Sequence, residues 1–308
     1  MELVLRTNQI SKRYSGKLAV NGVNMLVRKG DIYGLVGENG AGKTTLMRMI
    51  AGMALPTEGG LELFESSDLD SQRKKMGVLI ESPALFPNMT ARENLTYLQI
   101  LMGVEYSKQI DSLLETVGLH QTGKKKVKNY SLGMKQRLGI AIALLGSPEF
   151  LILDEPINGL DVAGVKEVRD LLLKINCELG ATILISSHIL SELSRVANRF
   201  GILRNGILEE EFTAEELEKR SNNCLELRVS NVQDALQLLD SMQGIKKIQQ
   251  SSNDTLLVFG DVHLAASINR RLVENGVDVE KLGQVKEDLE SYYLKKNGGV
   301  EHDEAAAG

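Results

Sequence analysis

Short apolar runs alternate with amphipathic segments from the start of the chain to about residue 210. The apolar or β-branched runs predict strands of the kind buried in a parallel sheet, at Asp31–Val36, Val78–Ile80, Phe150–Leu153 and Thr182–Ile185. Apolar residues at helical spacing predict helices at Thr45–Ile50, Ala91–Met102, Gln109–Val117, Met134–Leu145 and Val162–Leu179. Strands that alternate with helices in this way favour an α/β fold.

Two segments depart from this alternation. Lys17–Arg28 predicts an antiparallel edge hairpin ahead of the strand at Asp31–Val36. Glu209–Arg220 is highly charged and predicts a solvated helix, after which Asn222 and Asn223 mark a turn. We therefore expect the first domain to span residues 1–218.

A smaller unit follows, with its own alternation of strands and helices. Its expected strands are Leu225–Val229 and Thr255–Phe259, and its expected helices are Val232–Met242 and Leu264–Asn275. This pattern predicts a small α+β domain over residues 224–294. The tail at residues 298–308 carries three acidic residues and three alanines, and we expect it to be disordered.

The composition limits the classes of function. A chain of 308 residues has room for about two domains, and 43% hydrophobic residues suffice for their cores. A net charge of −5 offers no basic excess for a phosphate backbone, so nucleic acid is not expected as a partner. Cys177 and Cys224 lack metal-ligand spacing and indicate buried thiols of a reducing compartment. No apolar run approaches a membrane span and Met1–Arg6 does not resemble a signal peptide, which predicts a soluble, cytosolic chain.

The most specific motif lies between a predicted strand and a predicted helix. Residues 37–44 read GENGAGKT and fit the phosphate-binding pattern G-x-x-x-x-G-K-[ST] at every fixed position. The glycines let the backbone bring N–H groups to phosphates, Lys43 supplies an ammonium, and Thr44 offers a hydroxyl to Mg²⁺. The N-terminus of the following helix adds partial positive charge. A chance Gly-rich turn is the alternative.

Two carboxylates follow another buried strand. Asp154 and Glu155 come directly after Phe150–Leu153, and ligands of open α/β sheets bind at such carboxyl ends. Asp154 is suited to hold Mg²⁺ through water, and Glu155 to polarise the water that attacks a γ-phosphate. A solvated strand end before the turn at Pro156 would explain these residues alone. Their combination with the phosphate-binding loop favours nucleotide chemistry.

A third motif completes a family resemblance. Tyr130–Leu138 reads YSLGMKQRL and resembles the signature motif of ATP-binding cassette (ABC) proteins, ahead of the carboxylate strand as in that family. The resemblance covers roughly residues 3–210. It implies a P-loop NTPase cassette of α/β class, with a mixed sheet core, an antiparallel edge and a helical subdomain at about residues 88–147. It also implies ATP and Mg²⁺ as cofactors.

The resemblance assigns roles position by position. Ser131 and Gly133 would bind the γ-phosphate of an ATP held by the opposite subunit, although a serine here would also N-cap the following helix. Tyr14 matches the aromatic that stacks on adenine, with an ordinary strand aromatic as the alternative. His188 matches the catalytic switch histidine that touches the γ-phosphate, and Asp161 matches the residue that contacts the other subunit. The phosphate-binding loop contributes Gly37, Asn39, Gly40, Ala41, Gly42, Lys43, Thr44 and Thr45.

Three positions depart from the family pattern. Glu81 stands where most cassettes carry a glutamine that senses Mg²⁺ and meets the membrane subunit, and its carboxylate can still ligate the metal. Leu132 and Met134 replace a glycine and usually a glutamine of the signature motif. These changes resemble one subgroup, the exporters associated with bacitracin or lantibiotic resistance and immunity, whose ATPase subunits also carry a C-terminal appendix.

The resemblance implies the ATPase subunit of a membrane transporter. Two copies would sandwich two ATP molecules and drive separate integral membrane permease subunits. The subgroup favours export of a peptide antibiotic or a similar amphiphile. Leu85–Asn94 would help to form the groove for the permease, so the chain would lie in the cytoplasm, peripheral on the inner face of the cell membrane.

Two other classes of protein are alternatives. A soluble cassette protein acting on ribosomes or DNA is less well supported, because the chain has one cassette and no heptads between Lys43 and Ser131. A nucleotide-binding regulator that no longer hydrolyses would require the loss of Glu155 or His188, and both are present.

Overall fold

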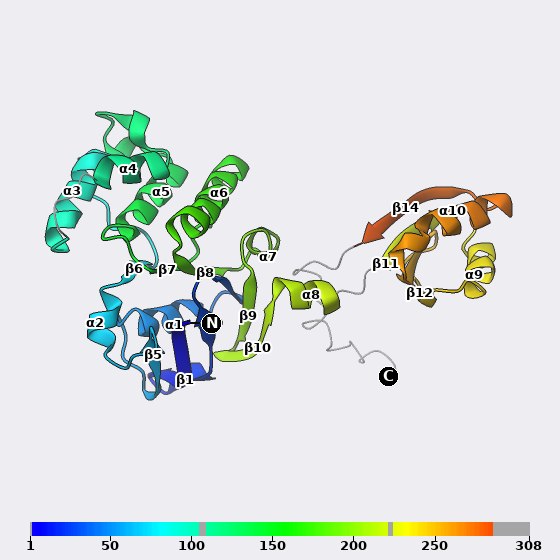
Figure 1. Ribbon diagram of the computed structural model, residues 1–308, viewed down its shortest axis with the longest axis horizontal. Coiled ribbons are helices and arrows are strands. Elements are labelled where there is room, and N and C mark those ends of the chain that lie inside the picture. The colour runs from blue at the N-terminus through cyan, green and yellow to red at the C-terminus, as the bar shows by residue number, and fades with distance from the viewer. Residues whose placement is uncertain (1, 105–108, 221–223, 286–308) are drawn as a thin grey trace, which may run out of the picture. The chain divides into compact units, whose positions relative to one another are not determined.

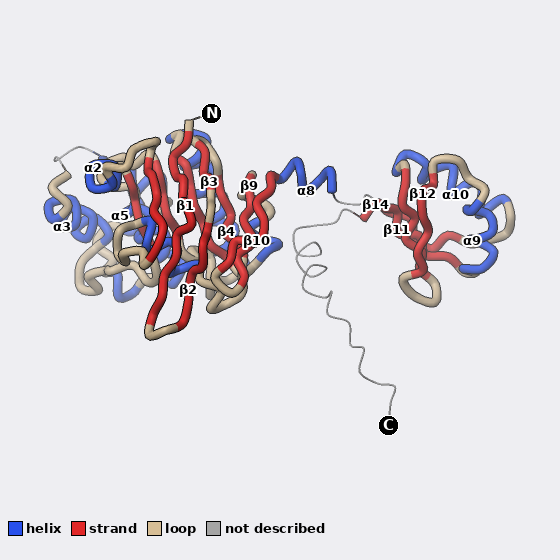
Figure 2. Tube along the Cα trace, turned by 90° about the horizontal axis from the view of Figure 1, so that it is seen from below, coloured by secondary structure: helices blue, strands red, loops and turns tan. Residues whose placement is uncertain are grey.

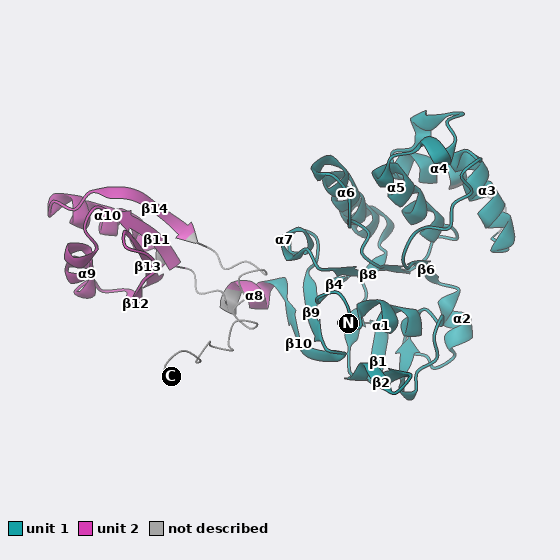
Figure 3. Ribbon diagram, turned by 180° about the vertical axis from the view of Figure 1, so that it is seen from behind, with its two compact units in different colours: residues 1–214 teal, residues 215–308 magenta. Residues whose placement is uncertain are grey.

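The computed structural model describes residues 2–104, 109–220 and 224–285. The tail expected at residues 298–308 and the end of the domain expected at 224–294 lie outside the described residues. The chain forms two compact units that divide between Ala214 and Glu215 (Figure 3). Within the described ranges, no helix combines the length and the apolar character needed to cross a membrane.

The first unit is built on a six-stranded sheet with the strand order β10-β9-β4-β8-β7-β6. All neighbouring strands pair in parallel except β10, which is antiparallel to β9. Every residue of β4, β7 and β8 is buried, as expected for central strands of a parallel sheet. The strands are β4 (Ile32–Val36), β6 (Met76–Leu79), β7 (Phe150–Leu153), β8 (Thr182–Ser187), β9 (Arg199–Arg204) and β10 (Ile207–Thr213). The parallel strands predicted from the apolar runs are confirmed, and their carboxyl ends lie at one edge of the sheet.

A second sheet has the long strand β1 (Leu3–Tyr14) at its centre, paired antiparallel with β2 (Lys17–Val23), β3 (Leu26–Arg28) and β5 (Glu58–Leu63) (Figure 2). The predicted hairpin within residues 17–28 is therefore wrong, because β2 and β3 pair with different parts of β1 and not with each other. The hydroxyl of Thr7 donates to the Val23 carbonyl and accepts from the Met25 N–H. The Thr7 side chain of β1 thus provides hydrogen-bond partners for backbone groups in the connection between β2 and β3.

The helices of the first unit fall into two groups. The helices α1 (Lys43–Ile50), α6 (Val162–Leu179) and α7 (Leu190–Leu193) follow strands of the main sheet. A separate group of helices lies away from α1 (Figure 1) and comprises α3 (Ala91–Leu101), α4 (Gln109–Thr116) and α5 (Leu132–Ala143). The predicted helices are confirmed, with ends that differ by at most two residues. Short helical segments are α2 (Leu69–Arg73) and the 3₁₀ turns His120–Thr122 and Val127–Asn129.

Local caps set several helix ends. Thr90 begins α3 in a capping box, because its hydroxyl accepts from the Glu93 N–H while the Glu93 carboxylate accepts from the Thr90 N–H. Gly180 ends α6 in a left-handed backbone conformation, which glycine adopts without steric cost. Local sequence signals thus mark where α3 begins and where α6 ends.

The helix predicted at Glu209–Arg220 is wrong in its first half. These residues form the end of β10 and then helix α8 (Ala214–Arg220). The strand forms because Phe212 is fully buried and its ring packs against that of Phe200. The neighbouring carboxylate of Glu211 also points inward, where it accepts hydrogen bonds from the Tyr33 hydroxyl at 2.8 Å and the Leu26 N–H at 3.2 Å.

The second unit has a four-stranded antiparallel sheet in the order β12-β13-β11-β14. Its elements are β11 (Cys224–Val229), α9 (Val232–Asp240), β12 (Ile245–Gln250), β13 (Thr255–Gly260), α10 (Ala265–Glu274) and β14 (Val279–Val285), with a 3₁₀ turn at Val262–Leu264. Leu227 and Leu256 of the sheet pack with Leu239 and Leu272 of the helices in one core. Both helices and the strands β11 and β13 agree with the predicted elements, whereas β12 and β14 were not predicted.

We expect Glu211→Gln to change the pH dependence of stability. Burial raises the pKa of Glu211 above its ordinary value of 4.5. As the pH rises, the unfolded chain therefore loses this proton first, so the contribution of Glu211 to stability is full below pH 4.5 and falls as the pH rises through the folded pKa. Glutamine keeps the acceptor for Tyr33 but cannot ionise.

Urea unfolding of the wild type and Glu211→Gln between roughly pH 4 and 7 checks this expectation. As the pH rises through this range, the free energy of unfolding of Glu211→Gln should increase relative to that of the wild type. Above the folded pKa of Glu211, the difference between the two should become constant. A difference that does not vary with pH would contradict the account.

Candidate functional site

The phosphate-binding loop connects the buried strand β4 to helix α1. Gly42 precedes α1 with φ +108°, and a Cβ atom at this position would lie 2.4 Å from the Ala19 carbonyl oxygen. A Cβ atom at Gly37 would lie 2.4 Å from the Leu203 carbonyl oxygen. Both positions therefore require glycine for steric reasons within the chain, and the loop leads directly into the N-terminus of α1.

The side chain of Lys43 is buried above this loop. Its ammonium donates to the carbonyl oxygens of Gly37 at 2.6 Å and Glu38 at 3.2 Å. The same nitrogen lies 3.2 Å from Oε1 of Glu155, with which it forms an ion pair. The two predicted residues Lys43 and Glu155, from different strand ends, are thus brought together.

Asp154 joins the phosphate-binding loop to the neighbouring strand β8. The Thr44 hydroxyl donates to one carboxylate oxygen of Asp154 at 2.7 Å, and the Ser186 hydroxyl donates to the other at 2.5 Å. Ser186 also accepts from the Glu155 N–H at 2.9 Å. Hydroxyl and carboxylate oxygens such as those of Thr44 and Asp154 are ligands that suit Mg²⁺. In the part of the chain that the structure describes, no group of three or more His, Cys, Asp and Glu side chains is placed to bind one metal.

Glu155 is held between two partners. Its Oε2 lies 2.8 Å from Nδ1 of His188, and its Oε1 faces Lys43. Its backbone has φ +49°, an unusual value for a residue other than glycine, and such conformations persist only where the surrounding structure holds them. The structure thus brings together the predicted base and the predicted switch histidine.

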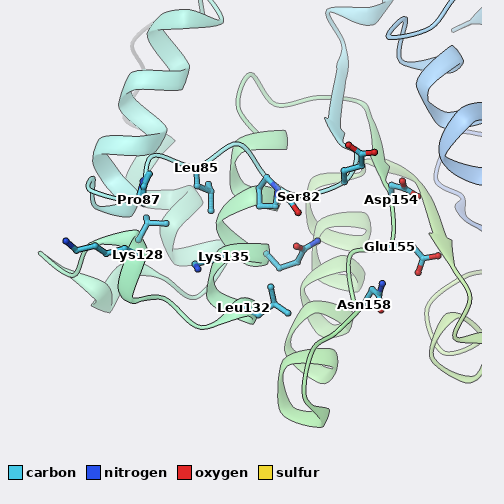
Figure 4. Close-up of a pocket in the computed structure, with 13 residues that line it drawn as sticks. Ser82, Leu85, Pro87, Lys128, Leu132, Lys135, Asp154, Glu155 and Asn158 are labelled. Atoms are coloured by element: carbon cyan, nitrogen blue, oxygen red, sulfur yellow. The ribbon is translucent and has the colours of Figure 1, made fainter.

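A cavity of about 510 Å³ opens beside the two carboxylates. Figure 4 shows Asp154 and Glu155 at one side of this cavity and Leu132 and Lys135 of α5 at another. Glu81 also lines it, but its carboxylate forms an ion pair with Arg48, whereas the Thr44 hydroxyl binds Asp154. The predicted metal ligand Glu81 is therefore near the other acidic groups but bound to a different partner.

The signature segment presents its helix end to solvent. Ser131 is exposed and N-caps α5, because its hydroxyl accepts from the Met134 N–H at 3.2 Å. Asp161 caps α6 in the same manner by accepting from the Gly164 N–H at 3.0 Å. A Cβ atom at Gly133 would meet no atom nearer than 3.8 Å, so packing within the chain does not require glycine there.

The signature residues lie apart from the chain's own phosphate-binding loop. Among the described residues, those around the small cavity over the loop come from the loop itself, from the start of α1, from β2 and from Glu155, and none comes from α5. They are Ala19, Glu38, Asn39, Gly40, Gly42, Lys43, Thr44, Thr45 and Glu155. Ser131 and Gly133 are thus not brought together with Lys43 in this chain.

Two residues of the site were missed in the sequence, and the predicted residue Tyr14 is not among the described residues that line its two cavities. Ser186 bridges Asp154 and Glu155, and its place two residues before His188 was the available signal. Ala19 lines the cavity over the loop with its backbone, and a contact made by the backbone cannot be predicted from the residue type. Tyr14 ends β1 with 45% of its surface exposed, and the Lys12 ammonium lies 5.1 Å from its ring centre.

Comparisons with known proteins identify the family of this chain. The family model described as ABC transporter matches residues 20–158. The bacitracin transport ATP-binding protein BcrA of Bacillus licheniformis is 40% identical over 97% of this chain and 99% of its own length. The lantibiotic transport ATP-binding protein SrtF of Streptococcus pyogenes is 43% identical over 71% of this chain and 96% of its own length. The solved structure of cbiO1 from Clostridium perfringens, part of the ABC transporter complex cbiONQ, has a TM-score of 0.65 at 26% identity and covers 71% of this chain and 92% of its own.

The phosphate-binding loop, the carboxylate strand and the exposed signature helix on this fold define an ATP-binding cassette. The chain belongs to the ABC transporter family, as an ATP-binding subunit that hydrolyses ATP. The match to BcrA extends through both units, whereas the match to SrtF uses nearly all of SrtF and only 71% of this chain.

We expect Ser186→Ala to disturb both carboxylates. The substitution leaves an oxygen of Asp154 and the Glu155 N–H without their buried partner, which should cost about 1–3 kcal/mol of stability. Displacement of the two carboxylates should also lower ATP turnover by about tenfold or more.

The matched control is Ser187→Ala, at the next buried serine, whose hydroxyl bonds the Ile189 backbone and not the carboxylates. Chemical unfolding and steady-state phosphate release measure the two effects. Equal losses of turnover in both variants would contradict a special role for Ser186.

Proposed function

We propose that this chain is one half of an ATP sandwich whose hydrolysis powers export through separate membrane permease subunits. Each of two copies would supply the phosphate-binding loop for one ATP and the signature segment for the other. The cargo class favoured by the names of the relatives is a peptide antibiotic or a similar amphiphile.

One observation carries the two-chain proposal. The chain has an exposed helix N-terminus at Ser131 that can bind an anion, yet no residue of α5 lines the described cavity over its own loop. Gly133 is free of close contacts within the chain, so its lack of a side chain would serve a group that approaches from outside. A nucleotide held by a second copy is the group that fits both features.

The chemistry of each half-site follows from the residues at the strand ends. Lys43 and the N-terminus of α1 would bind the phosphates, where phosphate oxygens would take the place of Glu155 beside the ammonium. Thr44 and Asp154 would hold Mg²⁺, which supplies charge neutralisation to the phosphates. Glu155, aligned by His188, would take the proton of the attacking water.

Three further roles belong to the same proposal. Tyr14 would stack its exposed ring on adenine, and Asp161 would contact the second copy next to the signature segment. The remaining loop residues Gly37, Asn39, Gly40, Ala41, Gly42 and Thr45 would supply backbone or side-chain contacts to the phosphates.

The surface around Leu85–Asn94 is the proposed permease contact. Asn94 accepts from the Phe86 N–H at 2.8 Å and donates to its carbonyl at 3.2 Å, which fixes this segment against α3. Exposed apolar side chains continue along α3 at Tyr97, Ile100 and Leu101. Such a patch suits a protein partner, and a membrane permease would place the chain at the cytoplasmic face of the membrane.

We expect Glu155→Gln to keep ATP binding and to lose most turnover. Glutamine preserves the size of the side chain but cannot accept the proton from water, and a general base typically contributes about 10²- to 10⁴-fold. Nucleotide binding and phosphate release measure the two properties separately. Glu178→Gln, on the exposed face of α6, is the control and should behave as the wild type. Turnover near the wild-type rate in Glu155→Gln would refute the assignment.

We expect a chain that ends at Arg220 to bind ATP with nearly the wild-type affinity. All the elements that carry the loop, the carboxylates and His188 lie in the first unit, which we propose as an independent domain. Circular dichroism should first establish that the shortened chain folds, and calorimetric titration then gives its affinity for ATP. A folded chain with an affinity lower by about tenfold or more, 1.4 kcal/mol, would show that the second unit supports the site.

A further inference from the structure

The parallel pairing of β6 and β7 brings Glu81 to the same sheet edge as the catalytic carboxylates. Leu79 pairs with Leu153 in register, and the Asp154 N–H donates to the Leu79 carbonyl at 2.8 Å. Glu81 follows Leu79 by two residues, as Glu155 follows Leu153. Glu81, Asp154 and Glu155 accordingly line the same cavity of about 510 Å³.

Arg48 holds the carboxylate of Glu81 against helix α1. The guanidinium of Arg48 forms an ion pair with Glu81 Oε1. Thr44 and Arg48 are four residues apart and both are only partly buried, so they share one face of α1. The residue that binds the Glu81 carboxylate therefore lies about one helical turn along α1 from the threonine that reaches Asp154.

Each carboxylate at this edge has its own hydrogen-bond or ion-pair partners. Glu155 pairs with Lys43, and Asp154 accepts hydrogen bonds from two hydroxyls. Glu81 would leave an extra negative charge beside bound phosphates if Arg48 did not offset it, and charges at such separations interact appreciably in a partly desolvated cleft.

The ion pair between Arg48 and Glu81 is constrained in orientation but contributes little to stability. The backbone of Glu81 has φ +66°, a left-handed conformation that residues other than glycine rarely adopt. This backbone conformation fixes the point from which the Glu81 side chain extends. The side chains of Arg48 and Glu81 are 38% and 63% exposed, and exposed ion pairs contribute little to stability. Such a pair can therefore respond to a cation or an anion that binds nearby.

We propose that Arg48 is a positioning residue that acts through Glu81 and sets how strongly ATP binding depends on Mg²⁺. Arg48 cancels the charge of Glu81 next to the phosphates and holds its carboxylate away from the Thr44–Asp154 oxygens. Without Arg48, the carboxylate repels nucleotide that carries no metal and attracts the cation. This inference rests on the proposed Mg²⁺ site of Thr44 and Asp154.

The test compares full-length chains carrying Arg48→Gln, Glu81→Gln or both. The dissociation constant of a fluorescent ATP analogue is measured for each chain with Mg²⁺ and with EDTA, at equal ionic strength. Arg6→Gln is the matched control, because Arg6 forms an exposed ion pair with Glu62 between β1 and β5 of the antiparallel sheet. Thermal unfolding of every chain checks that the fold is retained.

We expect Arg48→Gln to weaken binding in EDTA by about three- to tenfold, with a smaller loss in Mg²⁺. Glu81→Gln should tighten binding in EDTA and reduce the effect of Mg²⁺. The double variant should return to nearly the wild-type affinity in EDTA, because removal of both members of the ion pair leaves this edge with the same net charge as in the wild type. Arg6→Gln should match the wild type.

Two results would overturn the proposal. Arg48→Gln could weaken binding equally with and without Mg²⁺, or the double variant could retain the full loss seen for Arg48→Gln. A different result, a wild-type chain that binds the analogue equally well in EDTA and in Mg²⁺, would overturn the metal part of the proposed function and with it the premise of this inference.

Discussion

Two hydrogen bonds to Asp154 join three neighbouring strand ends into one site. Thr44, which follows β4 and its loop, donates to one carboxylate oxygen, and Ser186, near the end of β8, donates to the other. Asp154 itself follows β7, the next strand in the sheet. Because these strands are parallel and adjacent, all three loops leave the same edge, and the carboxylate fixes their spacing. Together with the ion pair between Lys43 and Glu155, these hydrogen bonds place the phosphate-binding loop relative to the proposed base Glu155.

The same edge supports the proposal that the chain holds only part of a catalytic centre. Lys43, Glu155 and His188 form a connected set of side chains at the carboxyl ends of three strands. Ser131 and Asp161 instead begin helices at exposed positions, where their side chains cap the chain's own backbone. Caps of this kind leave further N–H groups of the helix start available to an anion. The division between a completed phosphate loop and an open signature helix is the physical basis of the two-chain proposal.

Local sequence was sufficient for the parts of the site that depend on special backbone or on a motif. Gly37 and Gly42 are required by carbonyl oxygens at 2.4 Å from an added Cβ atom, and the pattern that they belong to is readable without a structure. Buried parallel strands were also predictable, since continuous apolar runs such as Phe150–Leu153 signal them.

Long-range contacts decided what the sequence could not. The segment around Glu211 has the composition of a solvated helix, but pairing with β9 and the buried hydroxyl of Tyr33 make it a strand. Ser186 became part of the site only because β7 and β8 are adjacent. The ion pair between Arg48 and Glu81 likewise depends on how α1 lies beside the end of β6, which no spacing in the sequence specifies.

Mixing two inactive variants tests the shared site most directly. Lys43→Ala should remove the phosphate loop's ammonium, and Ser131→Arg should block the signature helix, so each chain alone should hydrolyse ATP very slowly. In a mixed pair, one of the two sites would combine an intact loop with an intact signature segment. The account predicts that mixing restores a clear fraction of wild-type ATP turnover. If the mixture stays as inactive as its separate components although mixed pairs form, the site is not shared between chains and the account is contradicted.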